Sequence, residues 1–302
     1  MRVSAQHKTS FSRQVFAACV CISLASPSWV WSEQSELVVA VPVANMYSKA
    51  SEDADVVSQA IYGSPLKVLE ESEGWARVRT ADDYTGWIRL DAAHRPSSND
   101  QVDHASPKTV WVNSQLANLY RETDVTAHRP VLSLPFETRL EVEKEGTGDD
   151  QGWLEVRLLD GGTAWIQAGD VVTDSPPLTI AESIALAKRF LGVTYLWGGR
   201  SSLGYDCSGF TQMLVRSRGI NMPRDADLQA AWTGVAPVER KRLRPGDLLF
   251  FGSAPDHITH TGMYIGHGEF IHDTTHGRPG VQISRLRDQL WTRLLVACRR
   301  VK

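Results

Sequence analysis

One cysteine of this sequence stands where a nucleophile could be formed. Cys207 belongs to an Asp-Cys-Ser-Gly motif at residues 206–209, after which apolar side chains recur at helical spacing (Phe210, Met213, Leu214). The pattern predicts a helix that begins at Cys207, with Asp206 as its cap, and ends near Gly219. We expect the N-terminus of this helix to lower the pKa of the thiol. Its free N–H groups could also stabilise an oxyanion.

A thiol nucleophile needs a base that a third group orients. Five of the nine histidines lie between residues 257 and 276. Three short strands are predicted before and within this stretch, at 248–251, 262–266 and 269–273. His260 precedes the second strand and His272 lies near the end of the third, so antiparallel pairing can make them neighbours. One of the two rings could then orient the other, which would act as the base. The other three are expected at the surface or in turns (His257, His267, His276).

Cys207 has two structural alternatives, a buried inert thiol or a disulfide with Cys298. The apolar run 294–298 makes Cys298 the better core thiol, and the polar motif around Cys207 argues against both alternatives. The remaining cysteines lie in an apolar N-terminal stretch (Cys19, Cys21), so too few remain for a disulfide framework.

A metal site is the rival from another class of chemistry. The pairs His257/His260 and His272/His276 have the spacing of zinc ligands. A zincin pair would lie on a helix with a neighbouring glutamate, whereas residues 273–280 are typical of a turn. We therefore expect no metal and no cofactor.

A second helix is predicted before the cysteine. Thr179 and Glu182 have the spacing of a capping box. Apolar residues then follow at helical spacing (Ile180, Ile184, Ala187, Leu191), and Gly192 ends the run.

The first half of the chain contains a duplication. A Gly-Trp motif occurs at 74–79 and again at 152–157, and each is followed by a second tryptophan twelve residues after the first (Trp75 and Trp87, Trp153 and Trp165). Upstream, residues 43–47 match residues 116–120. Alternating side chains and Asp/Gly turns predict short strands, and units of about 60 residues built from such strands form small closed barrels. We expect the four tryptophans in the barrel cores.

Composition and the N-terminus restrict the class of protein. The 302 residues are 42% hydrophobic and 22% charged, with a net charge of −3, which excludes wholesale disorder and the basic field of a nucleic-acid binder. Basic residues precede a short apolar run at 15–24, followed by small residues. This pattern predicts a signal peptide over 1–32, cleaved at about 25–32, and hence export. A disordered tail is the alternative, and the run is too short to span a membrane.

The motifs resemble two known families. The duplicated units, over 36–96 and 108–173, resemble bacterial SH3 (SH3b) domains. Residues 178–302 resemble NlpC/P60 cysteine peptidases in five ordered motifs: Tyr195-x-Trp-Gly-Gly, the Asp-Cys-Ser-Gly-Phe motif, Pro-Gly-Asp-Leu-Leu-Phe-Phe, His260-x-Gly-x-Tyr-Ile-Gly and Phe-Ile-His272. The resemblance implies two small SH3-like β-barrels followed by an α+β, papain-like catalytic domain. It makes Cys207 the nucleophile, His260 the base and His272 the orienting residue.

The resemblance also implies a substrate. Such peptidases cleave the amide between γ-D-Glu and a diamino acid, diaminopimelate or Lys, in peptidoglycan stem peptides. A subgroup with two SH3b units requires a free N-terminal L-Ala. Carried over, Asp206 would face that amine, and Tyr84 would be the contribution of the SH3b unit. The other substrate and oxyanion residues would be Tyr195, Ser208, Arg224 and Asp225.

One departure and several alternatives stay open. The subgroup has an acid where Val57-Ser58 stand here, and Asp55 is the nearest substitute. Tyr84 could instead be a turn residue, and Arg224 with Asp225 a surface pair. The whole chain could be a wall-binding protein with an inactive hydrolase domain, or an amidase or acyltransferase with the same triad. A monomer that acts on stem peptides, without nucleic acid or a membrane span, is expected.

Overall fold

The structure of the chain is a computed structural model that describes residues 36–96, 108–173 and 176–302. The predicted signal peptide and both N-terminal cysteines lie outside these residues. Within the described ranges, no helix is long and apolar enough to cross a membrane.

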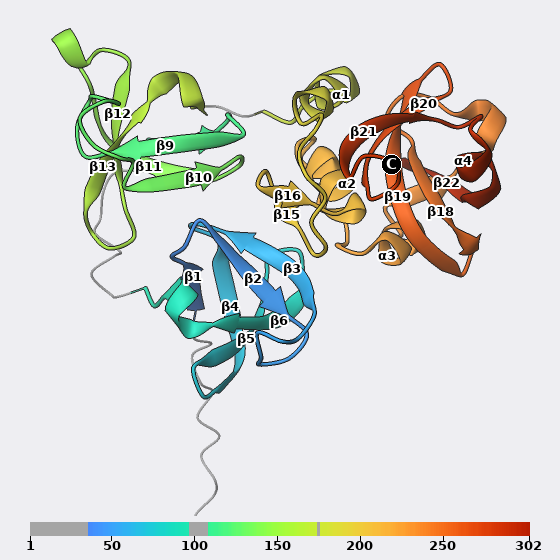
Figure 1. Cartoon of the computed structure of the whole chain (residues 1–302), viewed down its shortest axis with the longest axis horizontal. Coiled ribbons are helices and arrows are strands. Elements are labelled where there is room, and N and C mark those ends of the chain that lie inside the picture. The colour runs from blue at the N-terminus through green and yellow to red at the C-terminus, as the bar shows by residue number, and fades with distance from the viewer. Residues whose placement is uncertain (1–35, 97–107, 174–175) are drawn as a thin grey trace, which may run out of the picture. The chain divides into compact units, whose positions relative to one another are not determined.

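The first part is a seven-stranded antiparallel sheet with the order β3-β2-β6-β5-β4-β1-β7 (Figure 1). Its elements are β1 (Glu36–Val39), β2 (Val43–Tyr47), β3 (Val56–Ile61), β4 (Pro65–Ser72), β5 (Trp75–Arg79), β6 (Thr85–Arg89), the 3-10 helix η1 (Leu90–Ala92) and β7 (Ala93–His94). In β5, Ala76 and Val78 point into the core and Trp75 points outward, as the period of a strand requires.

The second part has the same strand order, shifted by seven elements: β10-β9-β13-β12-β11-β8-β14. Its elements are β8 (Thr109–Val112), β9 (Leu116–Tyr120), β10 (Leu132–Pro135), β11 (Arg139–Glu145), η2 (Gly148–Asp150), β12 (Trp153–Arg157), β13 (Thr163–Gln167), η3 (Ala168–Asp170) and β14 (Val171–Val172). The expectation that the four tryptophans form the cores is wrong, because all four are half-buried. Smaller aliphatic side chains on the opposite faces of the same strands fill the cores.

The third part is built on a six-stranded antiparallel sheet, β17-β22-β18-β19-β20-β21. Its strands are β17 (Val235–Pro237), β18 (Leu248–Ala254), β19 (His257–Gly266), β20 (Glu269–Thr274), β21 (Gly280–Arg285) and β22 (Leu295–Val301). A two-stranded sheet precedes it, β15 (Arg200–Ser201) and β16 (Gly204–Tyr205). The three strands predicted around the histidines are confirmed as β18, β19 and β20.

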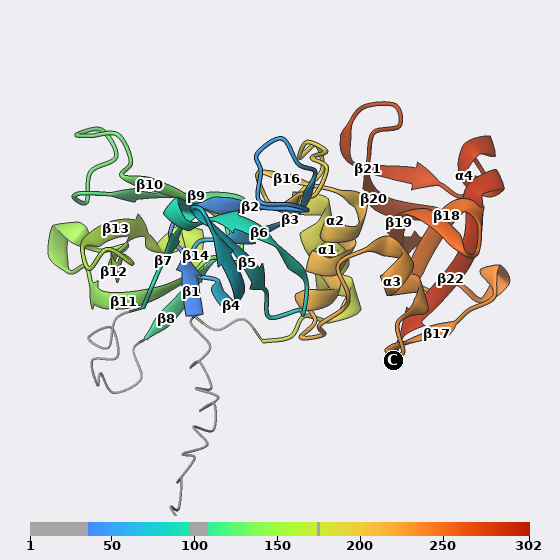
Figure 2. The ribbon, with the colours of Figure 1, turned by 90° about the horizontal axis from the view of Figure 1, so that it is seen from below.

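Helices cover both faces of the six-stranded sheet (Figures 1 and 2). They are α1 (Ile180–Arg189), α2 (Cys207–Arg216), α3 (Ala226–Ala231) and α4 (Gln289–Leu294), with the 3-10 helix η4 at Arg240–Arg242. The predicted capping box of α1 is confirmed, since Thr179 and Glu182 bond reciprocally. Leu248 and Phe250 face the core under α2, whereas Leu249 and Phe251 face the α4 side. This double burial explains the unbroken apolar run in β18.

The described residues belong to one compact unit, and specific hydrogen bonds join its parts. The backbone amide of Arg200 donates to Gln59 Oε1 on β3 at 3.0 Å. The Leu159 amide, in the turn between β12 and β13, donates to the hydroxyl of Tyr62 at 2.8 Å. The first sheet therefore contacts both of the other parts through polar groups.

Candidate active site

Cys207 is the first residue of α2, as the sequence predicts. Asp206 caps this helix, because its Oδ1 accepts a hydrogen bond from the Gly209 amide at 2.7 Å. The cap leaves the thiol at the helix N-terminus, facing β19. The Cys207 sulfur accepts a hydrogen bond from the backbone amide of Thr261, one residue after His260.

The thiol itself is buried, with 8% of the residue exposed. Burial, followed by the charge of Asp206, raises the pKa of Cys207 to about 12. Hydrogen bonds from the Thr261 and Ser208 backbones favour the thiolate but are the weaker effects. The expectation that the helix N-terminus lowers this pKa is therefore wrong for the free site, because desolvation of the thiolate outweighs the helix. Cys207 is a neutral thiol near pH 7 and depends on a base.

His260 and His272 lie on the paired strands β19 and β20, and their rings are hydrogen-bonded. His260 Nε2 lies 2.7 Å from His272 Nδ1. His260 is inside β19 rather than just before it. Burial lowers the pKa of His260 to about 4. Burial, and then the charges of His260 and His276, lower the pKa of His272. Both rings are therefore neutral near pH 7, so His260 can accept a proton.

Tyr195 is half-buried beside the nucleophile. Its pKa is raised by burial first and by the Cys207 charge second, so the phenol keeps its proton at neutral pH. A parallel β-bridge to Tyr205 fixes its backbone. A phenol that keeps its proton is a hydrogen-bond donor, as an oxyanion requires.

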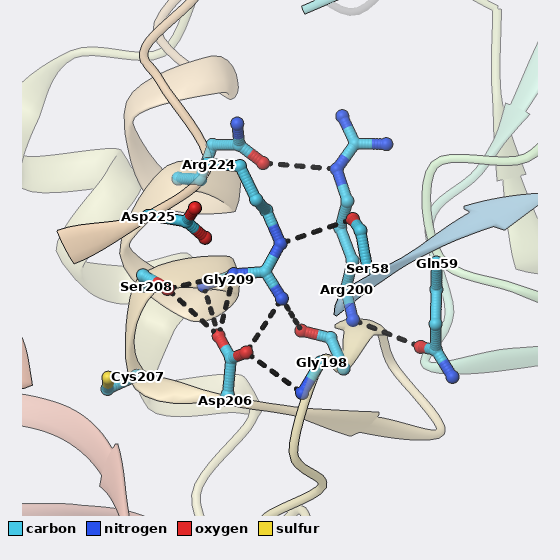
Figure 3. Close-up of polar contacts among 12 residues, drawn as sticks. Ser58, Gln59, Gly198, Arg200, Asp206, Cys207, Ser208, Gly209, Arg224 and Asp225 are labelled. Carbon is cyan, nitrogen blue, oxygen red and sulfur yellow. Dashed lines mark hydrogen bonds and ion pairs between the residues drawn. The ribbon is translucent and has the colours of Figure 1, made fainter. Parts of the chain in front are cut away.

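Asp206 does not face an open substrate site. Its carboxylate is buried against the Arg224 guanidinium, with Arg224 Nη2 at 2.7 Å from Oδ2 and Nη1 at 2.9 Å from Oδ1. The Gly198 amide and the Ser208 hydroxyl also donate to it, both at 3.1 Å (Figure 3). Because all these donors saturate the carboxylate, the expectation that Asp206 binds a substrate amine is wrong for this structure. Asp206 instead holds the start of α2.

Arg224 is likewise no surface residue, because only 1% of it is exposed. It also donates to Ser208 Oγ at 2.8 Å and, through Nε, to Ser58 Oγ of β3 at 3.3 Å. In Figure 3 the Cys207 sulfur points away from this Arg224 network. The position where the subgroup has an acid therefore carries a buried hydroxyl that contacts Arg224, and Asp55 is exposed.

Tyr84 and Asp225 meet across the first and third parts of the chain. The Tyr84 hydroxyl donates to Asp225 Oδ2 at 3.2 Å. Burial raises the pKa of Asp225 and, with the Asp225 charge as the second cause, raises that of Tyr84 to about 12. This contact agrees with a role beyond a turn for Tyr84. Of the carboxylates expected at the substrate, Asp225 is the one that the Arg224 network leaves unsaturated.

The remaining candidates have structural roles. Cys207 and Cys298 are both free thiols, and Cys298 is buried in the core under α4, as expected. His257, His267 and His276 are exposed, as expected. Within the residues that the structure describes, no three His, Cys, Asp or Glu side chains are grouped to hold a metal ion. His257 and His260 lie on a strand rather than on the helix that a zincin needs.

Sequence reasoning missed Ser284 and Gln59. Ser284 Oγ lies 3.0 Å from His272 Nε2, and Gln59 bonds the backbone of Arg200. Neither residue belongs to a motif that marks chemistry. The one available signal for Ser284 is its place on the strand that follows His272.

Two family models match the chain. Residues 192–300 match the NlpC/P60 family, and residues 46–92 match the bacterial dipeptidyl-peptidase Sh3 domain. The chain is also similar to a gamma-D-glutamyl-L-lysine dipeptidyl-peptidase of Bacillus cereus (strain ATCC 10987 / NRS 248), at 31% identity over 230 residues. That match covers 71% of this chain and 66% of the relative's length. A protein of the same name from Bacillus subtilis (strain 168) is 27% identical over 262 residues, which cover 82% of each chain.

A solved structure supports the fold. The crystal structure of an NlpC/P60 family protein from Bacillus cereus ATCC 10987 superposes with a TM-score of 0.75. The superposition covers 88% of this chain and 99% of that one, at 24% sequence identity. It therefore shows that the chain has the fold of that protein over most of its length.

Proposed function

Since this chain belongs to the NlpC/P60 family, with a bacterial SH3 region before that domain, we propose that it is a cell-wall cysteine peptidase. Its substrate would be the amide between γ-D-Glu and a diamino acid in peptidoglycan stem peptides. One observation carries the proposal. The buried Cys207 sulfur accepts a hydrogen bond from the backbone amide of Thr261, the residue after His260. The ring of His260 is in turn hydrogen-bonded to the ring of His272. The names of the two Bacillus relatives supply the class of substrate.

The mechanism follows from the neutral state of the thiol and of both rings. His260 takes the thiol proton as the Cys207 sulfur forms a bond to the γ-D-glutamyl carbonyl carbon. The carbonyl electron pair moves to oxygen, and the Cys207 amide and the Tyr195 hydroxyl donate to that oxyanion. Collapse breaks the C–N bond, and His260 gives its proton to the leaving amine. Water then attacks the thioester, with His260 again as the base, and the thiol is restored.

We propose that the substrate's free amine meets Asp225 and Tyr84 rather than Asp206. Asp225 is half-buried, and its carboxyl group can ionise. Its Oδ2 accepts a hydrogen bond from the Tyr84 hydroxyl of the first sheet at 3.2 Å. An ammonium group beside this carboxylate would form a charge-assisted hydrogen bond. A peptide whose L-Ala amine is acetylated would leave the carboxylate without that partner.

The finer domain limits and export belong to the same proposal. We infer that residues 36–96 and 108–173 are two SH3-like barrels and that residues 178–302 are the catalytic domain. The identical strand orders of the two sheets support a second barrel. A signal peptide over 1–32 would deliver the enzyme to the cell envelope, where its substrate occurs.

The test is mass spectrometry of products. The protein without residues 1–32 is incubated with L-Ala-γ-D-Glu-diaminopimelate, with its N-acetylated form and with purified sacculi. Release of L-Ala-γ-D-Glu from the free-amine peptide alone is expected, and Cys207→Ala should abolish it. Cleavage of all three would contradict the free-amine requirement. The absence of any Cys207-dependent product would contradict the peptidase itself and favour a wall-binding protein.

A further inference from the structure

Ser284 contacts the side of His272 that faces away from the base. Its Oγ lies 3.0 Å from His272 Nε2, whereas His272 Nδ1 bonds His260. The pairing of β20 with β21 sets this contact, because Phe270 lies opposite Ser284 and His272 lies opposite Gln282. Ser284 is therefore the diagonal neighbour of His272 on the same face of the sheet.

The groups around His272 Nε2 offer it no alternative hydrogen-bond partner to the Ser284 hydroxyl within the described residues. Gln282, which lies directly opposite, donates instead to the carbonyls of His276 and Arg278, both at 2.9 Å. The rings of Phe270 and Trp291 stand 4.5 and 4.8 Å from the His272 ring and offer no acceptor. His272 is fully buried, so water does not replace the serine. Among the hydrogen bonds of the described residues, the Ser284 hydroxyl is the partner of this nitrogen.

The two hydrogen bonds of His272 make the tautomers of both rings interdependent. A neutral imidazole has one N–H donor and one acceptor nitrogen. If His272 carries its proton on Nε2, Ser284 accepts it and His272 Nδ1 accepts from His260 Nε2–H. Nδ1 of His260 is then free to take a proton. If His272 carries its proton on Nδ1, it donates to His260 Nε2, and the proton of His260 must sit on Nδ1. In that second arrangement His260 cannot act as the base through Nδ1.

We propose that Ser284 is a positioning residue that accepts the Nε2–H of His272 and so holds His260 in the tautomer that can act as a base. The inference rests on the proposed roles of Cys207, His260 and His272, and it adds a fourth residue to that chain. Ser284 touches neither the substrate nor the reacting sulfur. It acts through His272 alone.

Several elements contribute charged and titratable groups near the hydrogen-bonded series Ser284–His272–His260. His276, in the loop after β20, lies against Trp291 and disfavours a charge on His272. Asp206 favours a charge on His260. On the strands, Arg285 next to Ser284 is paired with Glu269 at 3.3 Å. Among the described residues, the charge that adjoins Ser284 along β21 is therefore paired.

The first test is a long-range ¹H–¹⁵N spectrum of the histidine rings in the full chain at pH 7. We expect His272 to carry its proton on Nε2 in the unsubstituted protein, and the same state in Ser284→Thr and Ser284→Asp. Ser284→Ala should give a mixture or the Nδ1–H form. An Nδ1–H form in the unsubstituted protein, or an unchanged spectrum in Ser284→Ala, would overturn the proposal. This readout does not depend on which peptide the enzyme cleaves.

The second test is the pH profile of peptide cleavage. Ser284→Ala should lower kcat about three- to tenfold with KM unchanged, and Ser284→Thr should restore it. Ser284→Asp accepts but cannot donate when ionised, and its charge should move the acid limb to higher pH. Ser133→Ala removes another half-buried serine hydroxyl, bonded to Asn118 at 2.6 Å, and controls for stability. An unchanged profile in Ser284→Ala would refute the role. If the unsubstituted protein cleaves no peptide, the proposed function fails, whereas the ring spectrum still decides the role of Ser284.

Discussion

The nucleophile and the base of this site are uncharged before substrate arrives. Burial raises the pKa of Cys207 to about 12 and lowers that of His260 to about 4. A preformed thiolate–imidazolium pair would require the opposite order of the two pKa values. The proton must therefore move during the attack, and catalysis is expected to tolerate mild acid.

This order of pKa values predicts the pH dependence of kcat/KM. Because His260 must be unprotonated to accept the thiol proton, activity should persist below pH 6 and be lost only as pH falls through about 4. Alkylation of Cys207 by iodoacetamide at pH 7, followed by peptide mapping, should be slower than that of a free cysteine. Cys207→Ala identifies the labelled peptide. Fast alkylation of Cys207, together with a loss of kcat/KM near pH 6.5, would indicate a preformed ion pair of Cys207 and His260 and contradict the argument.

Asp273 gives a second prediction at the scale of one residue. It is fully buried on β20, and no side chain within the described part of the chain donates a hydrogen bond to its carboxyl oxygens. Burial, followed by the charge of Asp206, raises its pKa to about 8. Between its unfolded pKa and about 8, the folded chain binds the extra proton, so stability falls as pH rises through that window.

Replacement of Asp273 by asparagine should therefore stabilise the fold more at high pH than at low pH. We expect a gain of about 2 kcal/mol at pH 8 and little change at pH 4, measured by urea unfolding. Asp256→Asn, at an exposed position, is the matched control. A loss of stability at pH 8 would show that the carboxylate has a favourable partner there.

At the scale of the element, the start of α2 depends on a buried ion pair. Arg224 neutralises Asp206, whose carboxylate caps the helix that presents Cys207. Arg224→Met removes the partner and leaves a buried charge, so the free energy of unfolding should fall by about 3–5 kcal/mol. Arg242→Ala breaks only an exposed pair with Glu239 and should cost less than about 1 kcal/mol. Equal losses in the two variants would contradict the structural role of Arg224.

The same element shows how far sequence reasoning reaches. The starts of α1 and α2 and the strands around the histidines were predictable, because caps and periodic patterns lie within a few residues. The burial of Arg224 was not, since its carboxylate and hydroxyl partners come from residues 18 and 166 positions away. The tryptophans were misplaced because alternation fixes two faces of a strand without saying which one is the core. The prediction of a lowered pKa for the Cys207 thiol was wrong for a similar reason, because burial is a property of the folded chain.

At the scale of the whole molecule, the first sheet contacts the catalytic domain at the residues that we assign to the substrate amine. Tyr84 and Asp225 are 141 positions apart in sequence, and the Tyr84 hydroxyl is hydrogen-bonded to the Asp225 carboxylate. The first sheet is thus more than a wall anchor in this proposal. It completes one end of the peptide site. Removal of the Tyr84 hydroxyl should therefore change the selectivity for the substrate amine more than it changes the stability of the fold.

Tyr84→Phe tests this argument. The substitution keeps the ring and removes the hydroxyl that orients Asp225, so KM for L-Ala-γ-D-Glu-diaminopimelate should rise about tenfold with kcat nearly unchanged. The preference for the free amine over the N-acetylated peptide should fall by the same factor. Tyr62→Phe is the control, because its hydroxyl accepts a hydrogen bond from Leu159 and joins the first sheet to the second without approaching Asp225. Since both variants lose one hydrogen bond between parts of the chain, a general loosening would affect them equally. A rise in KM confined to Tyr84→Phe would instead place the substrate amine at the contact between the first sheet and the catalytic domain.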